Sequence, residues 1–564
     1  MYGETLRKEV FMRRLVLLLL AGAVLFGYVP QSFRNISTGT LLEDDYDFIL
    51  DPGRMVWVKG GRLYTNLSNL VTTTEGLFNK TSLGTYLIGG KTTFGTLHLA
   101  GIYNRYSEEN PLFTGYVDRY GNWIYGEGDI YYVHYEDRDN ADGYDFMSEE
   151  HVVVSAYERY RSDDIYLGIG GLLTKTASAG LGFTMSRMRN TWFDYTLADT
   201  IRDHDLILNE DVYVYGGEGA ETGEYLNNYW SVFTSLWYAM DQKTRVGVAL
   251  GYRKRNIEDN YDYWWTEEED FSPEDPEVDV ERYEVVERDY DPLNTGGFYL
   301  TLRTRLGDIR EPHQEIGLRL YTSGGSVDSA RYYYMTGDED RTTLGDGEEF
   351  LIDTTIVDEL RNGSTGERGF SLWWKGIYVR DEKLTFGLGA RFQAWSGERT
   401  DTIARSERSF EQYNDGDNEE NDADDYVMTT SLFERWHERT TYAGYTITLP
   451  VGMEWRIKEY FAFRCGAVYS FTYATSTLVQ QLIGKEPETR RIEYGDGTVD
   501  EDLLEDPSDV TDGVSNTEDW REPSLDYFYG FGINPLPSLQ IDVMGCSNLT
   551  NLTNWRVSVT FKFH

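Results

Sequence analysis

Apolar and polar residues alternate in many segments of this chain, and each segment is about ten residues long. The last of them, residues 555–563, alternates without a break and stops one residue before the end of the sequence. Side chains of a strand point to opposite faces in turn, so Trp555 and Phe561 would share one face, and Arg556 and Lys562 the other. The pattern therefore predicts strands rather than helices.

Most of the alternating segments form pairs that are joined by a short turn. The seven predicted hairpins are 83–88 with 94–103, 165–173 with 179–188, 229–239 with 244–255, 297–306 with 315–322, 370–379 with 384–395, 441–455 with 461–473, and 525–533 with 539–544. The terminal strand is a fifteenth element, and residues 55–67 are a candidate for a sixteenth. Strands of about ten residues cross a bilayer when they are tilted.

Short turns alternate along the chain with long segments, and this asymmetry is informative about the class of protein. Together with the aromatic-ended terminal strand it resembles the bacterial outer-membrane β-barrel proteins, although His564 follows the last aromatic residue. The resemblance implies an all-β fold, a single transmembrane antiparallel up-and-down barrel of about 14–16 strands, with short periplasmic turns and long extracellular loops. A soluble β-sandwich is the alternative, but it would not explain the segregation of turn lengths.

The N-terminal region predicts export. An apolar run over residues 15–26 follows Met12 and two arginines, and it is shorter than the roughly 20 residues of a spanning helix. We expect residues 1–30 to be a signal peptide with its true start at Met12, and residues 31–82 to lead from the periplasm into the barrel and supply its first strand. Residues 83–564 would then form the barrel. The alternative for the apolar run is a buried terminal helix or strand.

Residues 44–54 contain several acids followed by Pro52 and Gly53. This segment resembles, over a few residues, the N-terminal segment that plugs the lumen of fatty-acid-transporter-like barrels. The other interpretation is a periplasmic segment with an ordinary Pro-Gly turn. The sequence leaves both open.

Charge is concentrated as unevenly as turn length. Of the formal net charge of -44, residues 256–294 contribute -14, residues 396–437 contribute -8 and residues 474–522 contribute -10. We therefore expect acidic external loops, which disfavours nucleic acid or an anionic membrane surface as their partner. A mean hydropathy of -0.52 excludes a helical membrane bundle.

If the apolar faces point to lipid, the same alternation places a set of charged side chains in the lumen. These candidates are Arg245, Arg253, Arg303, Arg305, Arg319, Arg391, Arg464, Arg556, Asp526 and Asp542, and Glu315 shares their face. Opposed charges in a narrow pore order water and select solutes. Alternatively, the arginines simply pair with acids from neighbouring strands or from an infolded loop.

Other chemistry has weaker signals. Asp415, Asp417, Asp422 and Asp424 cluster in one acidic loop, and carboxylates are ligands for Ca²⁺, but their spacing is not that of an EF-hand and a solvated loop needs no ligand. We expect no cofactor. The seven histidines are scattered without an HExxH or GxSxG motif, so we expect no enzymatic activity.

Glycine and cysteine positions add two smaller expectations. Gly168 and Gly170 lie in a predicted strand, where another chain segment would crowd the lumen or the strand would bend. Cys465 and Cys546 are predicted at opposite rims of the barrel, beyond disulfide reach.

A barrel of about 16 strands is wide enough to leave an aqueous channel. The leading hypothesis is therefore an outer-membrane porin for passive diffusion of small polar solutes or ions. A transporter of hydrophobic molecules, which would have an N-terminal plug and a lateral opening, is one alternative, and a surface adhesin or structural barrel with an occluded lumen is another. Expected partners are outer-membrane lipid and lipopolysaccharide and, through the C-terminal strand, the barrel assembly machinery.

Overall fold

The computed structural model describes most of the chain after its first thirty residues. The described residues are 31–68, 84–111, 115–117, 123–125, 128–136, 146–206, 210–271, 279–309, 311–344, 347–415, 425–505, 514–546 and 556–563. The predicted signal peptide and Trp555 lie outside these ranges.

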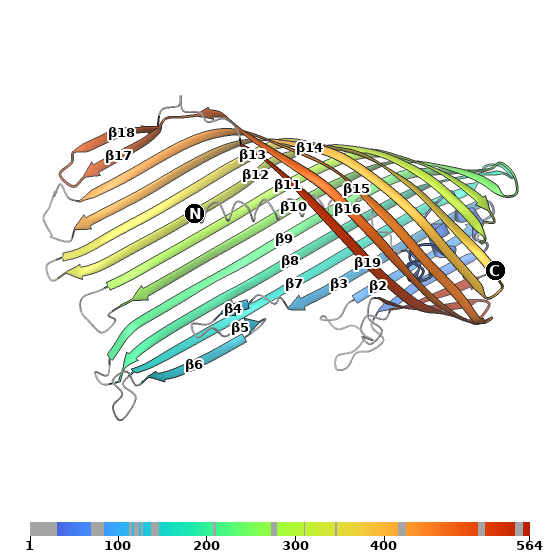
Figure 1. Cartoon of the computed structure of the whole chain (residues 1–564), viewed down its shortest axis with the longest axis horizontal. Coiled ribbons are helices and arrows are strands. Elements are labelled where there is room, and N and C mark those ends of the chain that lie inside the picture. The colour runs from blue at the N-terminus through green and yellow to red at the C-terminus, as the bar shows by residue number, and fades with distance from the viewer. Residues whose placement is uncertain are drawn as a thin grey trace.

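Sixteen antiparallel strands close into a ring (Figure 1). In ring order they are β1 (Gly61–Ser68), β2 (Gly84–Phe94), β3 (Leu97–Pro111), β7 (Phe146–Leu172), β8 (Ala177–Asp205), β9 (Glu210–Ala239), β10 (Thr244–Asp270), β11 (Asp279–Gly307), β12 (His313–Leu344), β13 (Gly347–Asp381), β14 (Leu384–Asp415), β15 (Tyr426–Lys458), β16 (Phe461–Lys485), β19 (Val514–Leu536), β20 (Leu539–Cys546) and β21 (Arg556–Phe563). Pairing of β1 with β21 closes the ring. The predicted up-and-down barrel is confirmed, and each of the seven predicted hairpins is present.

Five further strands lie toward the end of the barrel where the long connections are. β4 (Gly115–Val117) pairs with β5 (Trp123–Tyr125), and β6 (Gly128–Glu136) adds to β7. β17 (Glu488–Tyr494) and β18 (Val499–Glu505) form a hairpin that adds to β15. Figure 1 shows these elements at the end opposite to the C-terminus.

Strand length is where the sequence-based prediction is wrong. Residues 256–294 were expected to be a loop, but β10 and β11 stay paired from Asn256 opposite Asn294 to Asp270 opposite Val280. Tyr261, Tyr263 and Trp265 alternate in this stretch, and aromatic residues favour extended backbone despite the acids between them. Much of the acidic rim is therefore a tall extension of the wall rather than a set of loops.

The outer face of the barrel carries a belt of large apolar side chains. Leu250, Phe298 and Leu320 are 52%, 59% and 45% exposed, and they lie on adjacent strands β10, β11 and β12. Phe561 on β21 continues the belt. Apolar surface of this extent faces lipid rather than water, so the opposite face of each strand lines the lumen.

Within the described residues, four consecutive strands of the ring are short. β20, β21 and β1 have 8 residues each and β2 has 11, whereas β19 has 23. β20 pairs with β19 only from Phe528 onward. Within the described residues, the stretch of β19 before Phe528 therefore has a strand partner, β16, on one side only.

The two cysteines lie closer together than expected. Cys465 is opposite Tyr529 on β19, and Tyr529 is opposite Gly545 on β20, next to Cys546. The prediction of opposite rims is wrong, because β20 meets β19 at the same height as β16 does. Cys465 is nevertheless free, since two strand spacings of about 4.8 Å exceed disulfide reach.

The N-terminal segment forms short helices and turns instead of a strand. α2 (Phe33–Ser37), α3 (Asp45–Ile49) and the 3₁₀ turn η1 (Met55–Trp57) precede β1, which begins at Gly61 rather than at residue 55 as predicted. None of the described helices is long and apolar enough to cross a membrane. Phe48, Ile49 and Met55 are fully buried against the lumen faces of β1, β2, β3 and β7. We call residues 31–58 the plug.

Candidate functional site

The plug folds through its own polar contacts. The Ser32 hydroxyl caps α2 by accepting from the Asn35 amide at 3.1 Å, and Asp44 caps α3 by accepting from the Tyr46 amide at 2.8 Å. The Asp47 carboxylate accepts from the Asp44 amide at 2.9 Å and from the Ser32 hydroxyl at 2.6 Å. Because Asp47 bonds to both caps, it fixes the two helices relative to each other.

Glu43 connects the plug to one side of the barrel. One of its oxygens, Oε2, is 2.9 Å from Arg54 of the plug and 2.9 Å from Arg305 of β11, and the other is 3.1 Å from Lys375 of β13. Glu315 of β12 shares Arg305 at 3.4 Å and Lys375 at 3.8 Å. Burial alone would raise the pKa of Glu43, but Arg54, Lys375 and Arg305 together hold this pKa well below its usual range. The carboxylate therefore stays ionised and holds three cations.

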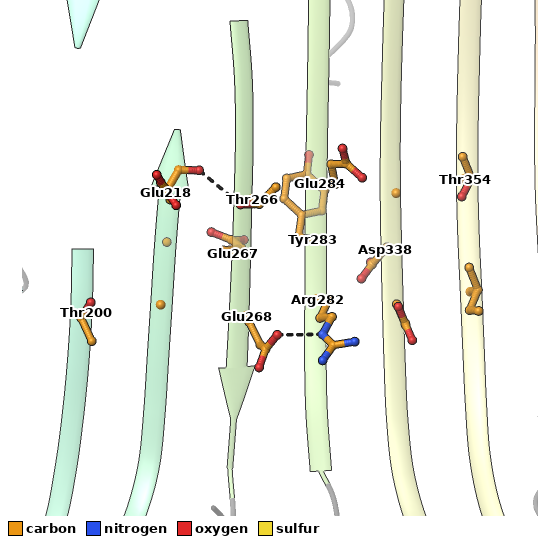
Figure 2. A pocket seen from close by; sticks show the side chains of 15 residues that line it. Thr200, Glu218, Thr266, Glu267, Glu268, Arg282, Tyr283, Glu284, Asp338 and Thr354 are labelled. Atoms are coloured by element: carbon orange, nitrogen blue, oxygen red, sulfur yellow. Dashed lines mark hydrogen bonds and ion pairs between the residues drawn. The ribbon is translucent and has the colours of Figure 1, made fainter. Parts of the chain in front are cut away.

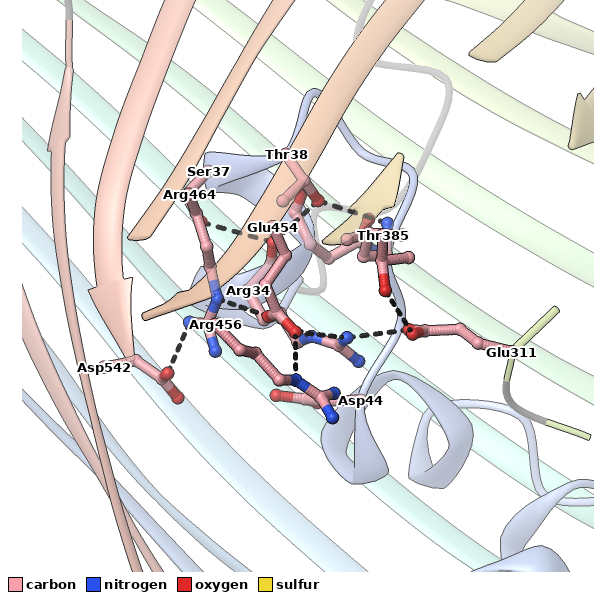
Figure 3. A network of polar contacts seen from close by, with 12 residues as sticks. Arg34, Ser37, Thr38, Asp44, Glu311, Thr385, Glu454, Arg456, Arg464 and Asp542 are labelled. Atoms are coloured by element: carbon pink, nitrogen blue, oxygen red, sulfur yellow. Dashed lines mark hydrogen bonds and ion pairs between the residues drawn. The ribbon is translucent and has the colours of Figure 1, made fainter. Parts of the chain in front are cut away.

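A second network joins the plug to β15 and continues through β16 to β20 (Figure 3). Arg34 donates to Glu454 of β15 at 2.8 Å and contacts Glu311, in the turn before β12, at 2.7 Å. Glu454 also accepts from Arg464 of β16 at 2.8 Å, and Arg464 contacts Asp542 of β20 at 2.5 Å. The five side chains alternate in charge, so each buried ion has a counter-ion.

Asp51 and its neighbours fasten the end of the plug near β9. The Asp51 carboxylate accepts from the Ser235 hydroxyl at 2.5 Å and from the Trp237 indole at 3.0 Å. Tyr166 of β7 donates to the backbone oxygen of Ile49 at 2.8 Å. The plug therefore contacts strands on several sides of the ring rather than one wall.

Glycines on the lumen faces of the strands let the plug backbone come close. A Cβ built on Gly452 would lie 2.0 Å from the Thr38 backbone oxygen, and one on Gly466 would lie 2.4 Å from the Gly39 nitrogen. A Cβ on Gly170 would lie 2.0 Å from the Pro52 oxygen. No other residue type fits these positions without moving the plug, which agrees with the crowding expected at Gly170.

Asp44 gives the plug a pH dependence with a definite sign. Burial and the neighbouring Asp47, Asp542 and Asp45 raise its pKa well above the usual value. Its contribution to stability is therefore complete at low pH and is lost as the pH rises through the raised pKa. Asp44→Asn keeps a capping side chain, so we expect its thermal unfolding midpoint to fall less than that of the wild type as the pH rises above the ordinary range of an aspartate. An unchanged pH profile in calorimetry would contradict this.

The predicted lumen residues separate into two groups. Arg303, Arg305, Arg464 and Asp542 bond to the plug or to its partners, and Arg245 lies 6.0 Å from the ring of Trp57. The others lie away from the plug. Arg253, Arg319 and Arg391 line the lumen on β10, β12 and β14, Arg556 lies 5.9 Å from the ring of Tyr106, and Asp526 is exposed on β19.

Sequence reasoning set apart residues 44–54, which include Asp51 and Arg54, as one possible plug but assigned them no contacts. It did not single out Arg34 or Glu43, nor the barrel partners Lys375 and Glu454. The available signal was a segment, residues 41–58, in which charged and large apolar residues alternate too closely for a solvated linker.

Most of the predicted cation site lies outside the described residues. Asp415 ends β14, and its amide donates to Asp425 at 3.0 Å. Asp417, Asp422 and Asp424 lie outside the described residues. In the ranges that the structure covers, no three His, Cys, Asp or Glu side chains are arranged to hold a metal ion.

A recess of about 550 Å³ crosses the tall extension of the wall from β8 to β13 (Figure 2). Six of its fifteen lining residues are acids, among them Glu218, Glu268 and Glu284, and one is a base, Arg282. Arg282 bonds to Glu268 at 2.7 Å, but both side chains are more than half exposed, so this ion pair is screened by solvent. The recess shows that the acidity predicted for the rim is carried by ordered strands.

No protein family and no curated protein matches this sequence. Among solved structures, a mutant ferric enterobactin receptor of Pseudomonas aeruginosa is 9% identical with a TM-score of 0.26, covering 89% of this chain and 80% of the receptor. A FadL homologue of Pseudomonas aeruginosa is 9% identical with a TM-score of 0.22, over 95% and 99% of the two chains. The ferric yersiniabactin uptake receptor of Yersinia pestis is 8% identical with a TM-score of 0.21, over 89% and 80%.

At these scores the likenesses do not bear on cargo, and the fold rests on the strand pairing of this chain. A closed ring of antiparallel strands with an apolar outer belt satisfies every backbone group within lipid. The tight hairpin turns lie at one end, and the long excursions between hairpins, much of them extended strand, lie at the other. Bacterial outer-membrane proteins likewise have short turns on one side and long excursions on the other. The chain is a sixteen-stranded outer-membrane β-barrel with its N-terminal segment seated in the lumen.

Proposed function

We propose that this protein is an outer-membrane transporter whose lumen is closed near its periplasmic end by the plug, and that cargo passes when the plug shifts. One observation carries the proposal: residues 31–58 are bonded to strands on several sides of the ring, namely β7, β9, β11, β13 and β15. A passive porin, the leading hypothesis from the sequence, needs a free path through this region. The geometry therefore favours a gated barrel over an open one.

The composition of the contacts supports a plug that can move. Burying ions costs desolvation energy, so a buried ion pair fixes position more than it adds net stability. Arg34 and Glu43 would regain water if the plug shifted, which offsets part of the lost attraction. Burial of the apolar side chains around Phe48 and Met55 stabilises the seated position of the plug, so it favours return of the plug after a shift.

A transporter of hydrophobic molecules is the second candidate. One-sided pairing of β19 favours it, because among the described residues the part of β19 before Phe528 has a partner strand, β16, on one side only. A route through the wall would let apolar cargo leave into lipid. Uptake of a fluorescent acyl chain into proteoliposomes without uptake of a polar dye of similar size would favour this candidate over the first.

The first test is planar-bilayer conductance of the full wild-type chain. We expect inserted barrels without steady open-channel current, because the plug occupies the lumen. Steady, voltage-independent steps from every inserted barrel would show a free path and would support the porin instead.

A further inference from the structure

A band of arginines lines the lumen beyond the plug. Its members are Arg253 and Arg255 on β10, Arg319 on β12 and Arg391 on β14. We call these four residues the arginine band. Tyr299 of β11 lies directly opposite Tyr321 of β12, so two phenol rings lie within the band.

We propose that the arginine band binds an anionic group of the cargo, a carboxylate, sulfonate or phosphate, before the plug opens. The proposal rests on the proposed transport function, because it names the cargo chemistry of the same lumen. It concerns a different part of the lumen from the plug.

Neighbouring side chains hold these guanidinium groups in fixed planes. The guanidinium carbon of Arg319 lies 4.2 Å from the ring centre of Tyr299, and that of Arg253 lies 5.1 Å from the ring centre of Tyr321. Arg391 donates to the Ser371 hydroxyl at 2.9 Å. A ring face or a hydroxyl orients a guanidinium without cancelling its charge. Such preorganised donors suit the bidentate recognition of planar oxyanions.

The charge balance of the band differs from that of the plug contacts. At the height of the band, the lumen faces of β10 to β14 carry four arginines and one carboxylate, Glu367, which interacts with Arg253 and Arg255. The residues counted are 251–255, 297–301, 319–323, 367–371 and 391–395. Around the plug, by contrast, the cations Arg305 and Lys375 each contact two carboxylates. The band therefore has an excess of positive charge in a wall of low dielectric, where an anion is attracted more strongly than in water.

The acidic extension does not cancel this attraction. On β10 the first acid of the extension that shares the lumen face is Asp259, four residues beyond Arg255, which corresponds to roughly 13 Å along a strand. Charges are screened over about 8 Å at physiological ionic strength. The extension therefore lowers the arrival rate of anions at the entrance, while the affinity at the band depends on the four arginines.

The test is equilibrium binding of the fluorescent trisulfonate pyranine to the detergent-solubilised full chain, followed by anisotropy. We expect saturable binding that weakens with added salt. The double variant Arg319→Gln with Arg391→Gln should weaken it by about tenfold for each arginine removed. The matched control is Arg368→Gln, because Arg368 lies on the outer face of β13 and is exposed; its affinity should equal that of the wild type.

Equal affinity of the double variant and the wild type would overturn the proposal, as would an equal loss in the Arg368 control. The variant with lysine at both positions keeps the charge, and partial recovery of binding there excludes a mere folding defect. Binding in detergent requires no movement of the plug. Absence of pyranine binding would therefore overturn the anion site alone, whereas open-channel current in the wild type would overturn the plug proposal alone.

Discussion

Replacing Glu43 with glutamine is expected to unseat the plug and to open the barrel. The change leaves Arg54, Arg305 and Lys375 facing a neutral amide, with Glu315 shared among them and Asp51 interacting with Arg54. Removing one partner from a buried ion cluster costs about 3–5 kcal/mol, because the remaining charges stay buried. By that energy, the ratio of barrels with a seated plug to barrels with an unseated plug should fall by about a hundredfold or more. Planar-bilayer recordings should show steady open-channel steps that the wild type lacks.

The matched control for this variant is Glu398→Gln. Glu398 also pairs with an arginine, Arg439, but both side chains are about half exposed on the outer wall. We expect closed barrels in the control. If Glu43→Gln stays as closed as Glu398→Gln, the ion cluster does not hold the plug.

Replacing Gly452 with valine is expected to exclude the plug by steric overlap. A Cβ at this position would lie 2.0 Å from the Thr38 backbone oxygen, and backbone on both sides leaves no flexible side chain to give way. The strand itself should tolerate valine, because the side chain points into the lumen and leaves the pairing with Gly387 and Gly466 in place. We therefore expect a folded barrel that conducts, measured by gel mobility of the unheated protein and by single-channel current.

Gly366→Val is the control for the steric prediction. The nearest atom to a Cβ at Gly366 is the Ser323 oxygen at 3.9 Å, an ordinary contact. This variant should fold and stay closed. A Gly452→Val barrel that folds and remains closed would show that the loop around Thr38 is not part of the closure.

The barrel could be predicted from the sequence because its signal is local. Residues 461–473 alternate strictly, so β16 and its lumen residue Arg464 followed from period two alone. The lengths of β10 and β11 did not, because acids in residues 256–294 resemble a loop by composition, whereas cross-strand pairing and aromatic residues decide the outcome. Charge composition is a weak guide where both faces of a strand meet water.

A plug was one of two open interpretations of residues 44–54, but its contacts could not be predicted in the same way, because they join residues that are distant in sequence. Arg34 meets Glu454 across 420 positions, and no periodicity relates the two. Gly452 did not predict the plug contact either. A glycine in a strand indicates that another chain segment comes close, but it does not identify that segment. That Cys465 and Cys546 lie at a similar height in the barrel could not be predicted either. Their relative height depends on how the short strand β20 pairs with β19, and local sequence does not encode this pairing.

A reversible tether tests most directly whether movement of the plug opens the lumen. A Cβ on Gly53 of the plug would lie 2.8 Å from the Ser235 hydroxyl oxygen of β9, so Gly53→Cys with Ser235→Cys places two thiols within disulfide range. The pair is built into the Glu43→Gln chain, with Cys465→Ser and Cys546→Ser to remove the native thiols. We predict open-channel current under reducing conditions and its loss on oxidation, restored by dithiothreitol. The same current in the oxidised and reduced states would contradict a gating plug.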